Sequence, residues 1–222
     1  MRTGAASGFA GPVDGPLRDA VEALLDTAQD GVLPIVQSGH PVLRRPAAPY
    51  TGQLGDLLPR LVDVMRATMH AAPGVGLAAP QVGIGLALAV VEDAGHDGDP
   101  RERHPLPFRV LVNPAYAPVG DRSAPFFEGC LSVDGWHALV ARHHGVRLTG
   151  QDDAGAPIEE VLTGWPARIV QHETDHLHGV LYVDRAVLRS LVSNANLAAL
   201  WGGGLEPGRV AEALGFEVPA RA

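Results

Sequence analysis

Residues 163–179 read TGWPARIVQHETDHLHG, and this stretch predicts the helix around which the rest of the fold is arranged. A proline in the first turn suits a helix start, because its missing N–H would be unpaired there in any case. The final glycine suits a helix end. His172 and His176 are four residues apart, which places both imidazoles on one face of the helix. We therefore expect a helix that offers two metal-ligating nitrogens to one cation.

Outward from this helix, the chain is typical of an α+β fold, with mostly antiparallel strands around the central helix and further helices flanking them. Short apolar runs bounded by Gly, Pro and Asp predict strands, and DDAG at residues 152–155 predicts a hairpin connection. Strands are expected at residues 32–37, 86–91, 108–113, 137–141, 146–149 and 158–162. Apolar residues at helical spacing predict helices at residues 17–28, 57–70, 187–201 and 209–214.

Cys130 is a candidate for a third metal ligand. It is the only cysteine in the chain, so no intramolecular disulfide is possible, and it lies within EGCLS at residues 128–132. A catalytic metal site needs three protein ligands and one open position. Together with His172 and His176, Cys130 would complete such a site. The alternative is a buried cysteine that only packs, and it would leave the histidine pair unexplained.

Glu173 and Gln81 are candidates for the chemistry beside that metal. Glu173 directly follows His172 and is rotated by about 100° around the helix, so it could address a bound water instead of the metal. Residues 74–81 read GVGLAAPQ, and these small residues would let the backbone line a narrow cleft. The amide of Gln81 could donate to a substrate oxygen. Taken alone, the same segment is more typical of a tight turn of small residues packed under a sheet.

Together these three segments resemble the peptide deformylase family. They match its Gly-x-Gly-Leu-Ala-Ala-x-Gln, Glu-Gly-Cys-Leu-Ser and Gln-His-Glu-x-Asp-His motifs in the same order, and residues 33–184 are similar to the family throughout. The resemblance implies a metal-dependent amide hydrolase that removes the N-formyl group from the N-terminal methionine of new polypeptides and releases formate. It implies Fe²⁺ held by Cys130, His172 and His176, with Zn²⁺ or Ni²⁺ able to substitute.

The resemblance also assigns roles to individual residues. Glu173 would take a proton from water and deliver it to the leaving nitrogen. The oxyanion would be met by Gln81 and by the backbone N–H of Leu131. The expected substrate-binding residues are Val75, Gly76, Phe126, Trp165 and Ile169.

Other positions are less determined by the sequence. Asp175 could orient a ligand histidine or be a solvated charge. Glu128 and Arg142 could form a buried pair or two separate surface charges. Residues 133–137 read VDGWH where many family members have a proline and an arginine, so the contacts at the substrate rim are not predicted. The eight histidines other than His172 and His176, with His137 among them, are expected on the surface or in loops.

Composition limits the partners and the location. The 222 residues include 17 Lys and Arg against 25 Asp and Glu, a formal net charge of −8. Proteins that grip nucleic acid by its phosphates usually have the opposite balance, so we expect no direct nucleic-acid readout. No apolar run approaches the length of a membrane span. The expected protein is cytoplasmic, with a flexible leader (1–16), a catalytic domain (17–186) and a C-terminal helical extension (187–222). Its expected partners are formyl-methionyl nascent polypeptides, with a possible transient ribosome contact.

Three alternatives remain open. A thermolysin-type metallopeptidase shares the His-Glu-x-x-His helix, although its usual third ligand is a downstream carboxylate and not an upstream cysteine. A structural metal site would use four protein ligands and would have no need for Glu173. A deformylase relative could act on a different small formylated amide.

Overall fold

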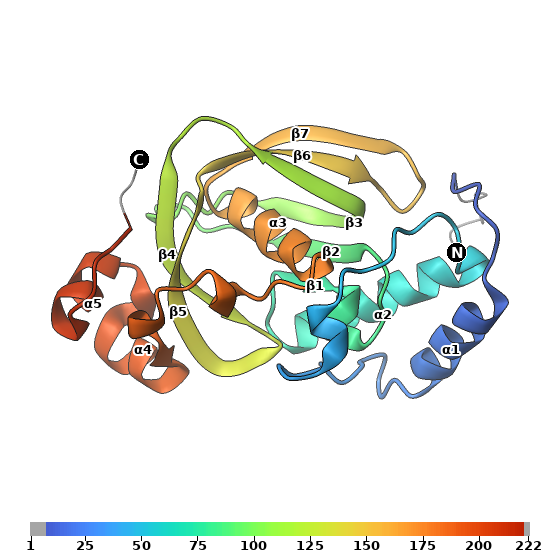
Figure 1. Cartoon of the computed structure of the whole chain (residues 1–222), viewed down its shortest axis with the longest axis horizontal. Helices are drawn as coiled ribbons and strands as arrows, with labels where there is room; N and C mark the ends of the chain where they lie inside the picture. The colour runs from blue at the N-terminus through green and yellow to red at the C-terminus, as the bar shows by residue number, and fades with distance from the viewer. Residues whose placement is uncertain (1–7, 220–222) are drawn as a thin grey trace.

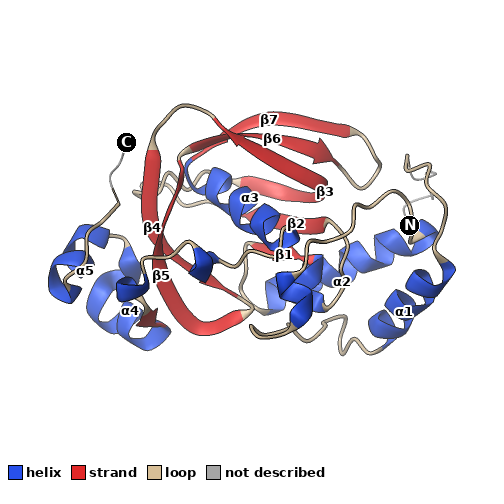
Figure 2. Cartoon of the chain, viewed as in Figure 1, coloured by secondary structure: helices blue, strands red, loops and turns tan. Residues whose placement is uncertain are grey.

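The computed structural model describes residues 8–219. Two antiparallel sheets surround one buried helix, α3, and other helices cover the outside (Figure 1; Figure 2). The larger sheet has the order β1-β2-β3-β6-β7 and consists of β1 (Gly76–Ala78), β2 (Leu88–Asp93), β3 (Leu106–Pro118), β6 (Gly145–Gln151) and β7 (Pro157–Thr163). The smaller sheet has the order β4-β5-β8 and consists of β4 (Ser123–Cys130), β5 (Val133–His143) and β8 (Val192–Ser193). The α-helices are α1 (Gly15–Asp26), α2 (Leu58–Ala71), α3 (Gly164–Leu177), α4 (Asn194–Trp201) and α5 (Pro207–Leu214). The expected α+β class is confirmed.

Side-chain alternation along β2 explains how the larger sheet becomes a middle layer. Successive residues of a strand point to opposite faces. Leu88 and Val90 join the core formed with α1 and α2, whereas Ala89 and Val91 join the core formed with α3. All four side chains are buried. The sheet therefore has an apolar layer on each face, and α3 is held in place by one of them.

Helix α3 is the element that the sequence predicts best. It starts directly after β7 and ends at Leu177, and twelve of its fourteen residues are buried. Gly164 opens it with a φ of +63°, and a Cβ there would lie 2.5 Å from the carbonyl oxygen of Glu102. Only glycine suits both the positive φ and the close approach. The helix is thereby fixed at its start, which determines where its histidines face.

Several strand predictions need correction. Residues 32–37 form no strand: apart from an isolated bridge between Gln29 and Val32, the segment makes single contacts, such as the N–H of Val36 to the carbonyl of Gln81 at 2.8 Å. Pro34 lacks the N–H that a ladder would need. The other five predicted strands exist, and β3 and β5 are several residues longer than expected. Strands β1 and β4 were not predicted.

The C-terminal segment also differs from its prediction. A single helix over residues 187–201 is wrong, because a 3₁₀ turn (Leu188–Ser190) and β8 precede α4. Ser190 Oγ accepts the N–H of Leu139 at 2.7 Å, and β8 pairs with β5. Ser193 then caps α4 by accepting the N–H of Asn196 at 3.3 Å. These tertiary hydrogen bonds outweigh the helical periodicity of the segment. The final helix is confirmed as α5.

The N-terminal end is described from Gly8 onward; residues 1–7 of the expected leader lie outside the described residues. The N–H of Gly8 donates to the carbonyl of Ala154 at 2.9 Å, and the N–H of Gly11 donates to that of Thr51 at 2.8 Å. Helix α1 begins at Gly15 with Asp14 as its cap. Within residues 8–219, no helix has the length and apolar character to cross a membrane.

Candidate functional site

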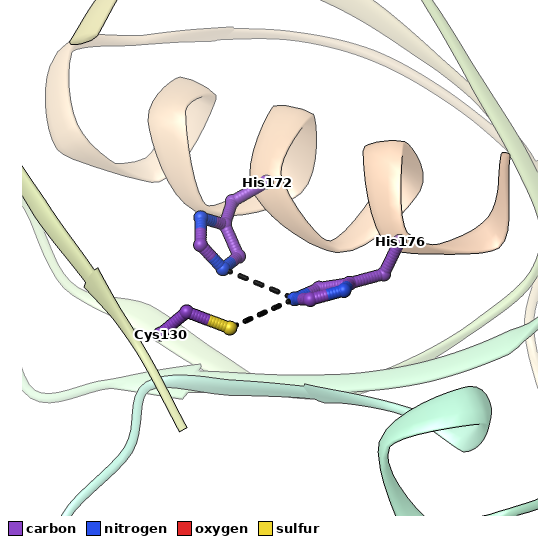
Figure 3. Close-up of side chains that lie close together, drawn as sticks. All are labelled: Cys130, His172 and His176. Atoms are coloured by element: carbon purple, nitrogen blue, oxygen red, sulfur yellow. Dashed lines mark hydrogen bonds between the residues drawn. The ribbon is translucent and has the colours of Figure 1, made fainter. Parts of the chain in front are cut away.

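The two histidines of α3 meet Cys130 at the end of β4 (Figure 3). The Nε2 atoms of His172 and His176 lie 3.2 Å apart, and Cys130 Sγ lies 3.3 Å from His176 Nε2. One donor atom from each of the three residues falls within 4.8 Å of the others. A thiolate and two imidazoles at this spacing suit one divalent cation with an open fourth position. The residues that the sequence singles out as ligands are therefore brought together.

Cys130 is held in place by its neighbours. The β4–β5 pairing becomes irregular between Gly129 and Cys130, where the strand ends. The backbone N–H of Ser132 points at Cys130 Sγ with an N–S distance of 3.4 Å. Gln81 Nε2 lies 3.6 Å from the same sulfur. These two contacts fix the position of the sulfur at the end of β4, and cysteine binds metals through its sulfur as a thiolate.

Glu128 orients His172 from the side away from the cluster. His172 Nδ1 donates to Glu128 Oε2 at 3.1 Å, which leaves Nε2 directed at Cys130 and His176. Glu128 is itself buried and paired with Arg142 and Arg168. Burial alone would raise the pKa of this carboxyl, but the two guanidinium groups hold it well below its usual range. The Glu128–Arg142 pair considered from the sequence is therefore buried.

Asp175 neither forms a hydrogen bond with a ligand histidine nor lies on the surface as a solvated charge. It is buried, so it is not a solvated charge, and it contacts neither ligand histidine by a hydrogen bond in the described part of the chain. Its carboxylate pairs with Arg142 and Arg185 and accepts from Tyr116 Oη at 3.1 Å. Asp175 thus links the Glu128 ion pair to the surface at Arg185.

As free imidazoles, the two histidines differ in pKa. Burial and the neighbouring His172 hold the pKa of His176 well below its usual range. Burial also lowers the pKa of His172, but hydrogen bonds to Cys130 and Glu128 raise it well above its usual range. A metal requires the neutral form of both, so binding displaces any proton from His172.

Glu173 lies beside the cluster in a buried position. A Cβ at Gly76 would lie only 2.2 Å from Glu173 Oε1, so the carboxyl group packs directly on the Cα of strand β1. Its Oε2 atom has no hydrogen-bond partner among the described residues. Burial raises the pKa of Glu173 to about 7. A carboxyl group with this pKa can accept and return a proton near neutral pH.

Gln81 presents its amide nitrogen to the same centre. Its Oε1 accepts the N–H of Ala78 at 2.8 Å, and this fixes the orientation of the carboxamide. Nε2 faces Cys130 Sγ and Ser132 Oγ, the latter at 3.3 Å. Leu131 follows Cys130, and its carbonyl oxygen accepts from Gln37 Nε2 at 3.0 Å. Gln81 and Leu131 both line the cavity described next.

A cavity of about 820 Å³ opens onto the cluster. Of the residues expected to bind substrate, four line it, and they are Val75, Gly76, Trp165 and Ile169. Phe126 is not among the lining residues: it is buried with its ring centre 5.7 Å from the Arg168 guanidinium, and its neighbour Phe127 lines the cavity instead.

Sequence reasoning missed several residues of the cavity wall. Arg101 and Arg103 come from the loop between β2 and β3, and the Arg101 guanidinium lies 4.3 Å from the Trp165 ring centre. His137 and Asn194 also line the cavity, although His137 was expected on the surface or in a loop. Only the departure from the family pattern at residues 133–137 pointed to this region.

Comparisons with known proteins agree with one another. A family model described as polypeptide deformylase matches residues 32–191. The chain is 60% identical over 212 residues to peptide deformylase 1 of Streptomyces coelicolor, covering 93% of this chain and 96% of the relative. It is 51% identical to a peptide deformylase of Bifidobacterium adolescentis, covering 93% and 97%. A crystal structure of a class I type b peptide deformylase from Acinetobacter baumannii with Met-Ala-Ser bound superposes with a TM-score of 0.64. It is 37% identical and covers 69% of this chain and 98% of that one.

Proposed function

We propose, since the chain belongs to the polypeptide deformylase family, that Cys130, His172 and His176 hold its metal and that Glu173 moves the proton. The protein is a metal-dependent hydrolase that removes the N-formyl group from newly made polypeptides. One observation carries the residue assignment: three metal-ligating atoms converge within 4.8 Å, next to a buried carboxyl group. Family membership favours this activity over the metallopeptidase and the structural metal site.

The proposed resident ion is Fe²⁺, with Zn²⁺ or Ni²⁺ able to substitute. Imidazole and thiolate ligands suit all three ions, and the resemblance to the family favours iron. When bound, such an ion supplies Lewis acidity and lowers the pKa of a bound water towards about 7. The chain contributes the fixed ligand set and, through Glu128, the orientation of His172.

Glu173 is proposed to take the proton from the attacking water and to deliver it to the leaving amine nitrogen. Its pKa of about 7 suits both steps, because the ionised and protonated forms are then close in free energy at neutral pH. Its place against Gly76 holds the carboxyl group beside the ligands of α3. Proton transfer by a positioned group typically contributes about 10²- to 10⁴-fold in rate.

Gln81 and Leu131 are proposed to stabilise the oxyanion that forms at the formyl oxygen when water attacks the formyl carbon. Gln81 Nε2 is already directed at Cys130, and the N–H of Leu131 belongs to the residue after that ligand. A formyl oxygen near the cluster would displace one contact of Gln81 Nε2, either Ser132 Oγ or Cys130 Sγ. Loss of one oxyanion donor typically costs about 10²- to 10³-fold in kcat.

The cavity is proposed to take the methionine side chain between Val75, Trp165 and Ile169, with the substrate backbone passing close to Gly76. A peptide that begins with methionine, Met-Ala-Ser, is bound in the Acinetobacter relative, which supports this class of ligand. Phe126, the fifth residue expected to bind substrate, does not line this cavity. Transient contact with the ribosome and a cytoplasmic location complete the proposal, because both bring the enzyme to its substrate as it is made.

Formate release from formyl-Met-Ala tests the proposal. The enzyme is purified without oxygen and loaded with one divalent metal, and wild type is compared with Glu173→Gln. This substitution keeps the side-chain volume and removes proton transfer. Glu159→Gln is the matched control, because Glu159 is exposed on β7. We expect a loss of about 10²-fold or more in Glu173→Gln alone. Release from other formylated amines, but not from formyl-Met-Ala, would favour the alternative substrate class.

A further inference from the structure

Part of the cavity wall comes from outside the three family motifs. Trp136 and His137 of β5 line it, and so do Asn194 and Gly203 of the C-terminal segment. Ligand sites for small molecules measure about 300 to 1,000 Å³. A cavity of about 820 Å³ therefore has room for more of a peptide than its formyl-methionine.

His137 lies next to the metal ligands. Strand pairing places it directly opposite Gly129, the residue before Cys130. A Cβ at Gly129 would lie 2.5 Å from His137 Nε2 and 2.7 Å from Cε1, so the imidazole ring lies across the Cα of that glycine. Any larger residue at Gly129 would push the ring away. The pair thus places a polar ring atom in the cavity wall, one residue from Cys130.

Asn194 determines which nitrogen of His137 carries the proton. His137 Nδ1 lies 2.8 Å from Asn194 Oδ1. An amide oxygen only accepts, so Nδ1 is the donor and Nε2 of the neutral ring keeps its lone pair. Nε2 is the atom over Gly129. It is therefore ready to accept a hydrogen bond from an N–H group in the cavity.

Trp136 adds an apolar surface to the same wall. Its carbonyl oxygen accepts from Tyr182 Oη at 2.8 Å, and its backbone pairs with Ser193 of β8. The residue is 46% exposed although its backbone is anchored on both sides. An anchored, exposed indole is well suited to contact a side chain of a bound peptide.

We infer that His137 is a specificity-determining residue that accepts a backbone N–H from the substrate peptide beyond its methionine. Asn194 is the positioning residue that fixes the His137 tautomer. Through Asn194, the C-terminal segment thus contributes to recognition of the substrate peptide, next to the indole of Trp136. This inference rests on the proposed function, because the reacting formyl group must lie at the Cys130 cluster for His137 to meet the following residues.

The test compares a short and a longer substrate on the metal-loaded, full-length enzyme. The substrates are formyl-methionine amide and formyl-Met-Ala-Ser. The readout is the ratio of kcat/KM for the longer substrate to kcat/KM for the shorter one. In Asn194→Ala this ratio should fall about three- to tenfold, through the KM of the longer peptide, as expected for one weakened hydrogen bond. Asn194→Asp keeps the acceptor and should keep the ratio. Asn196→Ala, two residues along α4 and outside the cavity wall, is the matched control.

A double variant separates positioning from direct contact. If Asn194 acts only through His137, then His137→Ala combined with Asn194→Ala should lower the ratio no further than His137→Ala alone. The inference is overturned if wild type gains nothing from the longer peptide, or if Asn194→Ala changes both substrates equally or neither. Absence of formate release by wild type from both substrates would overturn the proposed function, and the inference with it.

Discussion

Replacing Gly76 by alanine should inactivate the enzyme while leaving its fold intact. Strand β1 brings Gly76 so close to α3 that an added Cβ would lie 2.2 Å from Glu173 Oε1, 2.6 Å from Cδ and 2.8 Å from Cγ. All three atoms belong to the outer part of one side chain, which can rotate away. The backbone of Gly76 has no positive φ, so alanine suits it. The expected result is a displaced carboxyl group in an otherwise normal sheet.

The size of the effect follows from the role of Glu173. A positioned proton-transfer group is worth about 10²- to 10⁴-fold, and displacing it from the reacting water should cost a similar factor in kcat. Gly85→Ala is the matched control: it precedes β2, it also has no positive φ, and a Cβ there would meet nothing within 4 Å. That variant should keep the wild-type kcat.

Three quantities are measured for each variant: kcat for formate release, the melting temperature and the metal content. Together they separate a displaced Glu173 from a loss of the fold or of the metal. Gly76→Ala should retain its metal and melt within a few degrees of wild type, with kcat reduced at least 10²-fold. A Gly76→Ala enzyme with kcat within threefold of wild type would show that the activity of Glu173 does not depend on its place against β1.

Two further predictions concern the support of the site. Glu128→Gln removes the carboxylate shared by His172, Arg142 and Arg168, so metal affinity should fall about 10- to 100-fold and the free energy of unfolding by about 3–5 kcal/mol. A competing chelator and urea unfolding measure the two, and unchanged values would contradict the buried network. Deleting residues 187–222 uncovers the side chains of Phe127 and Leu139. At about 1.5–3 kcal/mol each, their exposure should lower the melting temperature clearly, and an unchanged melting curve would show that this cover contributes nothing.

The metal-binding part of the site could be predicted because three of its residues lie close together in the sequence, on one helix. His172, Glu173 and His176 lie on one helix, whose 3.6-residue period fixes their relative directions. Cys130 is the only cysteine of the chain. The α3 boundaries were predictable for the same reason, since Pro166 and Gly179 mark the two ends within the sequence itself.

Elements stabilised by distant partners were predicted poorly. Strand β1 has three residues and no side-chain alternation, because all three are buried. Strand β4 contains Pro125 and a run of four buried residues, which gives no two-residue period either. Residues 187–193 have a helical apolar pattern, but Ser190 and β8 form hydrogen bonds with β5 instead.

The residues that support the metal ligands and line the cavity could be predicted only in part. The sequence offered Asp175 as a partner for a ligand histidine, yet Glu128 takes that place because β4 ends beside α3. Phe126 and Phe127 are neighbours in the sequence, and which of them lines the cavity depends on how β4 packs in the folded chain. Strand register and tertiary pairing are long-range properties that periodicity does not contain.

The most direct test of the account is the metal content of wild type and of Cys130→Ala, His172→Ala and His176→Ala, measured together with formate release. We expect about one divalent ion per wild-type chain, a large loss of metal in each of the three variants, and activity that follows the bound metal. A variant that keeps both its metal and its activity without one of these three side chains would contradict the account.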